Sequence, residues 1–235
     1  MSSTPIPSAT RIPTRTFTSA RRINRSLTAG TEKRALIYLA EHAPAWLTSD
    51  QLTLLGLTAQ IGAGIAYALA RYKRFALLAV VLCLILNWLG DSLDGTLARV
   101  RHQQRPRYGF YVDHIVDVFG SVALMCGLAC SGLLHWQTGI AMLIAFLILS
   151  AESYLATYTL STFELSQGFF GPTELRILLI LGNLAALRSP WAHVLGHRLL
   201  LFDIGGAIGA ASMFVLAIVV TIRHTTELYQ QEPLP

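Results

Sequence analysis

Charged residues are scarce in this chain. Asp, Glu, Lys and Arg make up 13% of the 235 residues, and 53% of the residues are hydrophobic. Soluble domains carry about 25% charged residues, so this composition argues against a soluble domain and favours an integral membrane protein. The three cysteines all lie in apolar segments, which predicts buried small side chains rather than a disulfide framework. The sequence also contains no internal repeat.

The N-terminal segment lacks acidic residues. Residues 1–31 contain five Arg, no Asp or Glu, and many Ser, Thr and Pro. We expect residues 1–32 to form a disordered basic arm at an anionic membrane surface, although a mitochondrial transit peptide has the same composition. No apolar stretch typical of a secretory signal occurs in the first 30 residues. Since the basic residues lack interleaved aromatics, a nucleic-acid partner is not expected.

Six apolar runs predict an all-α integral membrane protein with six transmembrane helices, because a helix needs about 20 apolar residues to span a bilayer. The runs cover roughly residues 52–70, 75–97, 110–134, 138–162, 173–188 and 200–222. Before them, residues 33–50 show Leu36, Leu39 and Ala40 at helical spacing, which predicts an amphipathic helix in the interface. We therefore expect a membrane domain over residues 51–223 and a C-terminal tail over residues 224–235.

The basic residues predict the orientation of these spans. With both termini in the cytoplasm, thirteen Lys and Arg lie on the inner side and five on the outer side. The positive-inside rule favours this arrangement. It places the loop between the second and third spans in the cytoplasm, and we expect the membrane to be a bacterial inner membrane.

Four aspartates flank that loop. Asp91 and Asp94 end the second span at i, i+3 spacing, and Asp113 and Asp117 begin the third at i, i+4 spacing. Each pair shares one face of its helix, so two adjacent helices could aim four carboxylates into one cleft. A single Asp at mid-bilayer costs about 2.5–3.5 kcal/mol, which makes an accidental cluster improbable. Carboxylate oxygens suit Mg²⁺, Mn²⁺ or Ca²⁺.

Small residues and an arginine accompany the aspartates. Gly95 and Ala98 leave one helix face bare, Arg99 is a fixed cation that can hold a phosphate, and Gly109 opens the next helix. Metal ligands, bare backbone and an Arg together predict a diphosphate substrate.

These residues carry a resemblance to a known family. Their order resembles the signature of the CDP-alcohol phosphotransferases (also called CDP-alcohol phosphatidyltransferases), D-x-x-D-G-x-x-A-R-x8-G-x3-D-x3-D. All eight residue types match, but nine residues rather than eight separate Arg99 from Gly109. The resemblance in architecture covers roughly residues 33–222.

The resemblance implies a mechanism. Asp91, Asp94 and Asp113 would bind two Mg²⁺ or Mn²⁺ ions, with Asp117 in contact as well. Asp117 would be the general base that deprotonates an acceptor alcohol. Gly95, Ala98, Arg99 and Gly109 would seat the CDP group. The product would be a phospholipid, made from CDP-diacylglycerol or another CDP-alcohol with release of CMP. Family members also often form homodimers, and Gly205 and Gly209 provide a GxxxG spacing for close helix packing.

Two further residues are candidates for holding an acceptor or lipid phosphate. Glu152 is an acid inside the fourth span, and its alternative role is an interhelical hydrogen bond. Arg176 follows a Gly-Pro turn at the start of the fifth span, on the expected cytoplasmic side. Family members with phosphorylated acceptors tend to carry extra basic residues after Ser-Tyr in the fourth span. Here residues 155–157 are Leu, Ala and Thr, which favours an unphosphorylated acceptor.

Two other functions fit paired aspartates in a membrane. A polyprenyl transferase also uses Mg²⁺ and aspartate motifs, but those motifs lie far apart in the chain. A divalent-cation transporter usually binds its ion near the midplane, often within inverted repeats, and neither feature is present here. Phosphatidyl transfer is therefore the favoured interpretation.

Overall fold

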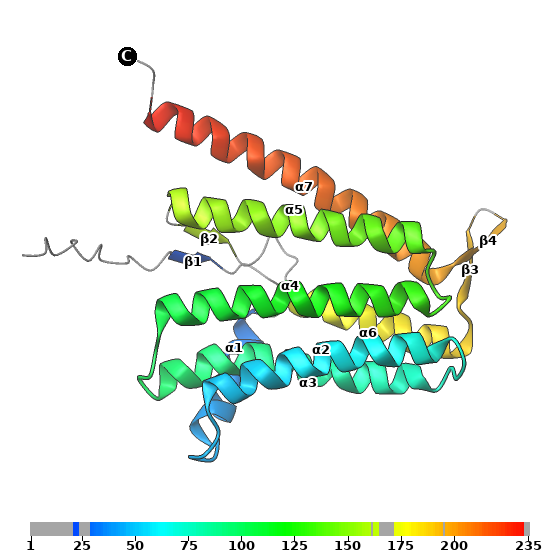
Figure 1. Ribbon diagram of the computed structural model, residues 1–235, viewed down its shortest axis with the longest axis horizontal. Helices are drawn as coiled ribbons and strands as arrows, with labels where there is room; N and C mark the ends of the chain where they lie inside the picture. Colours follow the sequence, from blue (N-terminus) through cyan, green and yellow to red (C-terminus); the bar gives the residue numbers. More distant parts are fainter. Residues whose placement is uncertain (1–20, 24–28, 161, 165–171, 195, 233–235) are drawn as a thin grey trace, which may run out of the picture.

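The protein is described by a computed structural model covering residues 21–23, 29–160, 162–164, 172–194 and 196–232. Seven helices make up most of this part of the chain (Figure 1): α1 Ala29–Glu41, α2 Ser49–Ala70, α3 Ala76–Val100, α4 Pro106–Cys130, α5 Trp136–Leu160, α6 Pro172–Arg188 and α7 Leu201–Gln231. Strand β1 (Arg21–Ile23) pairs in parallel with β2 (Thr162–Glu164), and β3 (Trp191–Val194) pairs antiparallel with β4 (His197–Leu200).

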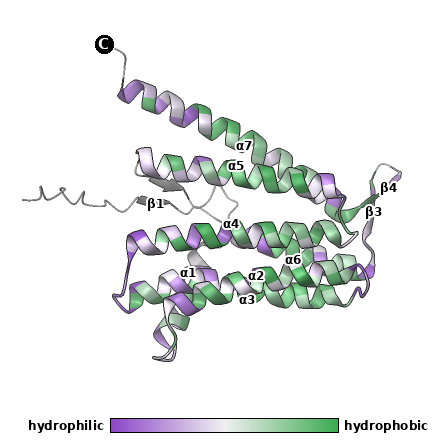
Figure 2. Cartoon of the chain, in the orientation of Figure 1, coloured by the Kyte–Doolittle hydropathy of each residue, from purple (hydrophilic) through white to green (hydrophobic). Residues whose placement is uncertain are grey.

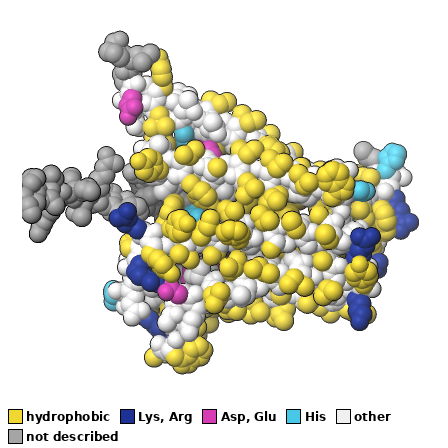
Figure 3. All heavy atoms as spheres, viewed as in Figure 1, with side chains coloured by type: hydrophobic (Ala, Val, Ile, Leu, Met, Phe, Trp, Pro, Cys, Tyr) yellow, Lys and Arg dark blue, Asp and Glu magenta, His cyan; other side chains and the backbone are white. Residues whose placement is uncertain are grey.

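Five of the described helices, α2, α3, α4, α5 and α7, are long and apolar enough to cross a membrane. The hydrophobic residues run along the middle of the bundle in Figure 2, and Lys and Arg gather at its two ends in Figure 3. The all-α membrane fold is therefore confirmed, while the count of six spans is not. The fifth predicted span is α6, whose 17 residues extend about 26 Å at 1.5 Å per residue.

Several element boundaries differ from the sequence-based expectation. Most of the expected arm lies outside the described residues, and α1 begins at Ala29 rather than at residue 33. At the other end, α7 continues to Gln231, so most of the expected C-terminal tail is helical. No Gly or Pro interrupts residues 223–232, so nothing in the sequence ends that helix earlier.

Helix α2 is the centre of the packing around the aspartates. Both α3 and α4 pack extensively against α2, whereas the described residues of α3 and α4 make few contacts with each other. Glycines allow this close approach: a Cβ on Gly90 of α3 would lie 2.6 Å from the Gly56 nitrogen, and one on Gly127 of α4 would overlap the Gly64 carbonyl. The expectation that the two aspartate helices adjoin is therefore corrected, because α2 joins them.

The start of α2 and the position of α6 are fixed by polar contacts. Thr48 and Gln51 form a reciprocal capping box at the α2 N-terminus, which satisfies backbone donors that the helix leaves unpaired. Deeper in the bundle, the fully buried Asn183 of α6 donates to the hydroxyl of Tyr67 on α2 at 2.7 Å. Helix α5 packs chiefly on α7 and less on α4.

The two ends of the bundle are formed by different elements. Helix α1, the α3–α4 loop and the C-terminal end of α7 lie together at one end, on the left of Figure 1. The α2–α3 and α4–α5 turns and the β3–β4 hairpin lie at the other end. All four aspartates belong to the halves of α3 and α4 next to the α1 end.

Candidate active site

The four predicted aspartates line one small, partly open cavity. Asp91 and Asp94 come from α3, and Asp113 and Asp117 come from α4. The remaining lining comes mainly from α2, namely Thr53, Gly56, Leu57 and Gln60, together with Asn87 of α3 and Val116 of α4. The helix between the two aspartate helices therefore forms a wall of the site.

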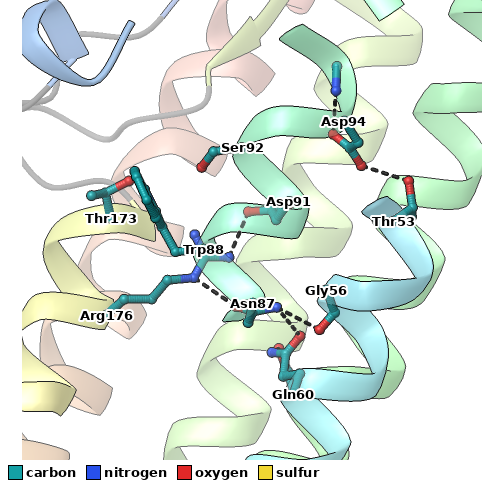
Figure 4. Close-up of polar contacts among 12 residues, drawn as sticks. Thr53, Gly56, Gln60, Asn87, Trp88, Asp91, Ser92, Asp94, Thr173 and Arg176 are labelled. Carbon is teal, nitrogen blue, oxygen red and sulfur yellow. Dashed lines mark hydrogen bonds and ion pairs between the residues drawn. The ribbon is translucent and has the colours of Figure 1, made fainter. Parts of the chain in front are cut away.

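Asp94 is the most buried of the four, with 5% of its surface exposed. One carboxylate oxygen accepts a hydrogen bond from the Thr53 hydroxyl at 2.7 Å, and the other accepts from the backbone N–H of Gly95. Ser49 of α2 also donates to the Asp94 carbonyl at 3.0 Å. The bonds from Thr53 and Gly95 hold the carboxylate in one orientation against α2, and Figure 4 draws the Thr53–Asp94 bond.

Asp91 lies one helical turn further from the α3–α4 loop and pairs with Arg176 of α6. The Arg176 guanidinium donates to the Asp91 carboxylate at 2.6 Å and to the Asn87 side-chain oxygen at 2.8 Å. Asn87 in turn donates to the Gly56 carbonyl at 3.0 Å and to Gln60 at 3.4 Å. This network, drawn in Figure 4, joins α2, α3 and α6 at the cavity.

Other predicted site residues lie beside the cavity rather than in its lining. Gly95 and Ala98 are half-buried on α3, and Arg99 is exposed and donates to Thr96. Gly109 is half-buried, with open space where a Cβ would lie. This group follows the aspartates toward the α3–α4 loop, so it lies between the cavity and the end of the bundle.

Glu152 is placed away from the cavity lining. Its carboxylate lies 2.5 Å from the His224 ring nitrogen of α7, and both side chains are nearly buried. Its neighbour Tyr154 turns instead toward α4, where its hydroxyl donates to the His114 carbonyl at 3.4 Å. The interhelical hydrogen bond that the sequence left open for Glu152 is therefore present.

The donor set fits a hard divalent cation by its chemistry. Four carboxylates face one cavity beside the Thr53 hydroxyl and the Gln60 and Asn87 amides, and oxygen ligands of these kinds are the ones that Mg²⁺ and Mn²⁺ take. Within the described ranges, no three His, Cys, Asp or Glu side chains converge on a single point as a closed ligand set. Coordination would need the carboxylates to rotate toward one another.

Sequence reasoning missed Thr53, Gln60 and Asn87. A signal was available, because Gln60 and Asn87 are polar residues inside otherwise apolar spans, and such residues usually face a bundle interior or a cavity. Thr53 gave no comparable signal, since a threonine near a helix N-terminus is ordinary.

Comparison with known proteins assigns the family. Residues 46–223 match the family described as CDP-alcohol phosphatidyltransferase. Archaetidylinositol phosphate synthase of Pyrococcus horikoshii is 27% identical over 120 residues, which are 51% of this chain and 57% of that protein. The match thus spans little more than half the length of that curated relative.

Solved structures of a second protein are also similar, namely phosphatidylinositol phosphate synthase (PgsA1) of Mycobacterium tuberculosis. The form with CDP-DAG bound is 21% identical, with a TM-score of 0.48 over 84% of this chain and 92% of that one. The complex with manganese and citrate is 20% identical, with a TM-score of 0.48 over 84% and 87%. Since the family match covers most of the chain, this multi-pass membrane protein belongs to the CDP-alcohol phosphatidyltransferase family, whose members transfer substituted phosphate groups.

Proposed function

We propose that this protein transfers a phosphatidyl group from a CDP-linked lipid, with CDP-diacylglycerol as the donor, to the hydroxyl of an acceptor alcohol, releasing CMP. The observation that carries the proposal is the convergence of Asp91, Asp94, Asp113 and Asp117 on one cavity near one end of the membrane helices. Since apolar side chains cover the middle of the face seen in Figure 3, a lipid-linked donor could approach the cavity from the bilayer.

The carboxylates would hold two divalent cations, Mg²⁺ or Mn²⁺, with Asp91, Asp94 and Asp113 as the main ligands and Asp117 beside them. Bound there, the ions would neutralise the diphosphate and stabilise the attacking and leaving oxygens. The bond between Thr53 and Asp94 supports this role, because it fixes the orientation of one ligand.

Asp117 would act as the general base. It would accept the proton of the acceptor hydroxyl, whose oxygen then forms a bond to the phosphorus that carries the lipid. The bond from that phosphorus to the CMP oxygen breaks, and CMP leaves. Gly95, Ala98, Arg99 and Gly109 would hold the CDP group, because they lie between the cavity and the end of the bundle.

Arg176 is the candidate for binding a phosphate at the cavity, because its guanidinium already bonds two residues of the lining. Glu152 is bonded to His224 instead, so we assign no acceptor contact to it. A phosphorylated inositol is the first acceptor to test, in view of the name of the curated relative. The lack of basic side chains at residues 155–157, directly after Tyr154, favours an unphosphorylated alcohol, and the experiment decides between the two kinds of acceptor.

The test is CMP release by the purified protein with CDP-diacylglycerol and Mg²⁺. Inositol phosphate, glycerol phosphate, inositol and serine are added singly, and Asp117→Asn is the comparison. We expect release that depends on one acceptor and falls at least about 100-fold in Asp117→Asn, since general base catalysis contributes about 10²–10⁴-fold. Release at the wild-type rate by a folded Asp117→Asn protein would refute the assignment of the base. If CMP is released only when a CDP-linked small alcohol replaces CDP-diacylglycerol, the lipid is the acceptor rather than the donor.

The arrangement in the membrane is part of this proposal. We propose that the termini and the active site face the cytoplasm of a bacterial cell, as the distribution of Lys and Arg favours.

We also propose that two copies associate through α7, because Gly205 and Gly209 have no neighbouring atom within 4 Å of an added Cβ among the described residues.

A further inference from the structure

The interfacial helix α1 reaches the active-site region through one side chain, Glu32. A single carboxylate oxygen of Glu32 accepts three hydrogen bonds: from the Trp88 ring N–H at 2.8 Å, the Thr173 hydroxyl at 2.9 Å and the Ser92 hydroxyl at 3.2 Å. Hydrogen bonds to an ionised carboxylate are about twice as strong as neutral ones. Glu32 therefore ties α1 to both α3 and α6.

The donors lie next to the residues of the site. Trp88 and Ser92 stand on either side of Asp91 along α3, and Thr173 lies in the first turn of α6, one turn before Arg176. Figure 4 shows Trp88, Ser92 and Thr173 close to the Arg176–Asp91 pair. Any shift of the first turn of α6 along α3 would move the Arg176 guanidinium relative to Asp91 and Asn87.

Attachment of α1 to the bundle does not depend on these bonds. Leu36 and Ala40 are buried in one apolar cluster with Leu93 and Leu97 of α3, and burial of such side chains already holds α1 against α3. Glu32 adds what apolar contacts lack, which is a directional link from α1 and α3 to the start of α6.

We propose that Glu32 is a positioning residue: it aligns the first turn of α6 with α3, so that Arg176 bonds to Asp91 and Asn87. The inference rests on the proposed function, because Arg176 is the phosphate-binding candidate of that site. Helix α1 thereby becomes part of the active-site framework.

Kinetics test the inference with Glu32→Ala and Glu32→Gln. Lys33→Ala is the matched control, because Lys33 is the exposed neighbour on the same helix. We expect Glu32→Ala to lower kcat/KM for CMP release about 10-fold, because a small displacement of the Arg176 guanidinium weakens its hold on the substrate phosphate. If Glu32 acts through Arg176, Glu32→Ala and Arg176→Gln should change the same parameter, either kcat or the KM for the same substrate. A glutamine side chain keeps an acceptor oxygen, so Glu32→Gln should stay within about threefold of wild type.

The double variant separates positioning from general destabilisation. In the Arg176→Gln background, Glu32→Ala should change kcat/KM by less than about twofold, since residues that act through one contact are not additive. Full additivity of the two effects would overturn the inference, and so would a Glu32→Ala enzyme as active as the Lys33→Ala control.

A second readout does not depend on activity. With Trp46, Trp136 and Trp191 replaced by Phe, Trp88 is the remaining tryptophan, and its emission reports the bond to Glu32. Glu32→Ala should shift this emission, and Lys33→Ala should not. An unshifted spectrum would overturn the inference. Absence of CMP release by the wild type with every acceptor would refute the proposed function instead, and the Trp88 spectrum would still decide the contact.

Discussion

At the scale of single residues, Asp91 and Asp94 have different surroundings although they share one cavity. Asp94 is buried and bonded to Thr53 of α2, whereas Asp91 is about a third exposed and paired with Arg176 of α6. A cluster of like charges is costly near a membrane unless cations balance it. Arg176 supplies one such cation in this structure, and divalent ions would supply the rest.

Replacement of Arg176 should affect activity strongly. In Arg176→Gln, the two charge-assisted hydrogen bonds to Asp91 and Asn87 are lost. Each such bond contributes about 1.5–3 kcal/mol, so kcat/KM for CMP release should fall by at least about 10-fold. The matched control is Arg188→Gln, at the other, exposed end of the same helix. Equal activity of the two variants would show that Arg176 does not bind the substrate and that its bonds to Asp91 and Asn87 do not contribute to turnover.

The motif residues could be predicted from the sequence because their spacing alone places them on one helix face. Gln60 and Asn87 were detectable only as polar residues inside apolar spans, and Thr53 gave no signal, because the contacts that place all three at the cavity are made with partners on other helices. Arg176 was predicted near the site from the end of the span on which it lies, but its pairing with Asp91 depends on how α6 packs against α3.

At the scale of the helices, α2 organises the site. It contributes one wall of the cavity and separates α3 from α4 along most of their length. Close contact at Gly56–Gly90 and at Gly64–Gly127 sets how near the aspartate helices come to α2. Small residues at helix contacts are the usual means of close packing inside membranes.

A methyl group at one of these contacts should therefore disturb the whole site. In Gly127→Ala, the new Cβ would overlap the Gly64 carbonyl, and overpacking of this kind costs about 1–3 kcal/mol. We expect a lower midpoint of thermal unfolding in detergent and slower CMP release. Gly30→Ala in α1 is the control, because nothing described lies within 4 Å of a Cβ at that position; its midpoint should be unchanged or higher. A Gly127→Ala protein as stable as the control would contradict the packing described for α2 and α4.

The existence of the helices was predictable from the apolar runs, but the residues at which they end and the helices against which they pack were not. The predicted run 75–97 corresponds to Ala76–Val100 and the run 173–188 to Pro172–Arg188. The β3–β4 hairpin was not expected, because its two four-residue strands join at Gly196 with positive φ and carry little pattern. Nor could periodicity reveal that α2 lies between α3 and α4, since that depends on glycine contacts between helices distant in sequence.

At the scale of the whole molecule, the polar cavity and the apolar surface occupy different parts of the bundle. The aspartate cavity and α1 lie toward one end of the bundle, and apolar side chains cover the middle of the face seen in Figure 3. Under the proposed function, this arrangement would let a lipid-linked donor stay in the bilayer while a water-soluble acceptor enters from the helix ends.

The most direct test of this account is Mn²⁺ binding by the purified protein, measured by electron paramagnetic resonance and competed with Mg²⁺. The variants are Asp113→Asn in the cavity and Asp50→Asn, an exposed aspartate on the same side that pairs with Arg105. The account predicts that the wild type and Asp50→Asn bind Mn²⁺ alike, and that Asp113→Asn binds at least about 10-fold more weakly, since even outer-shell changes cost 10–100-fold. Equal affinity of Asp113→Asn and the wild type would contradict the claim that this cavity is the metal site.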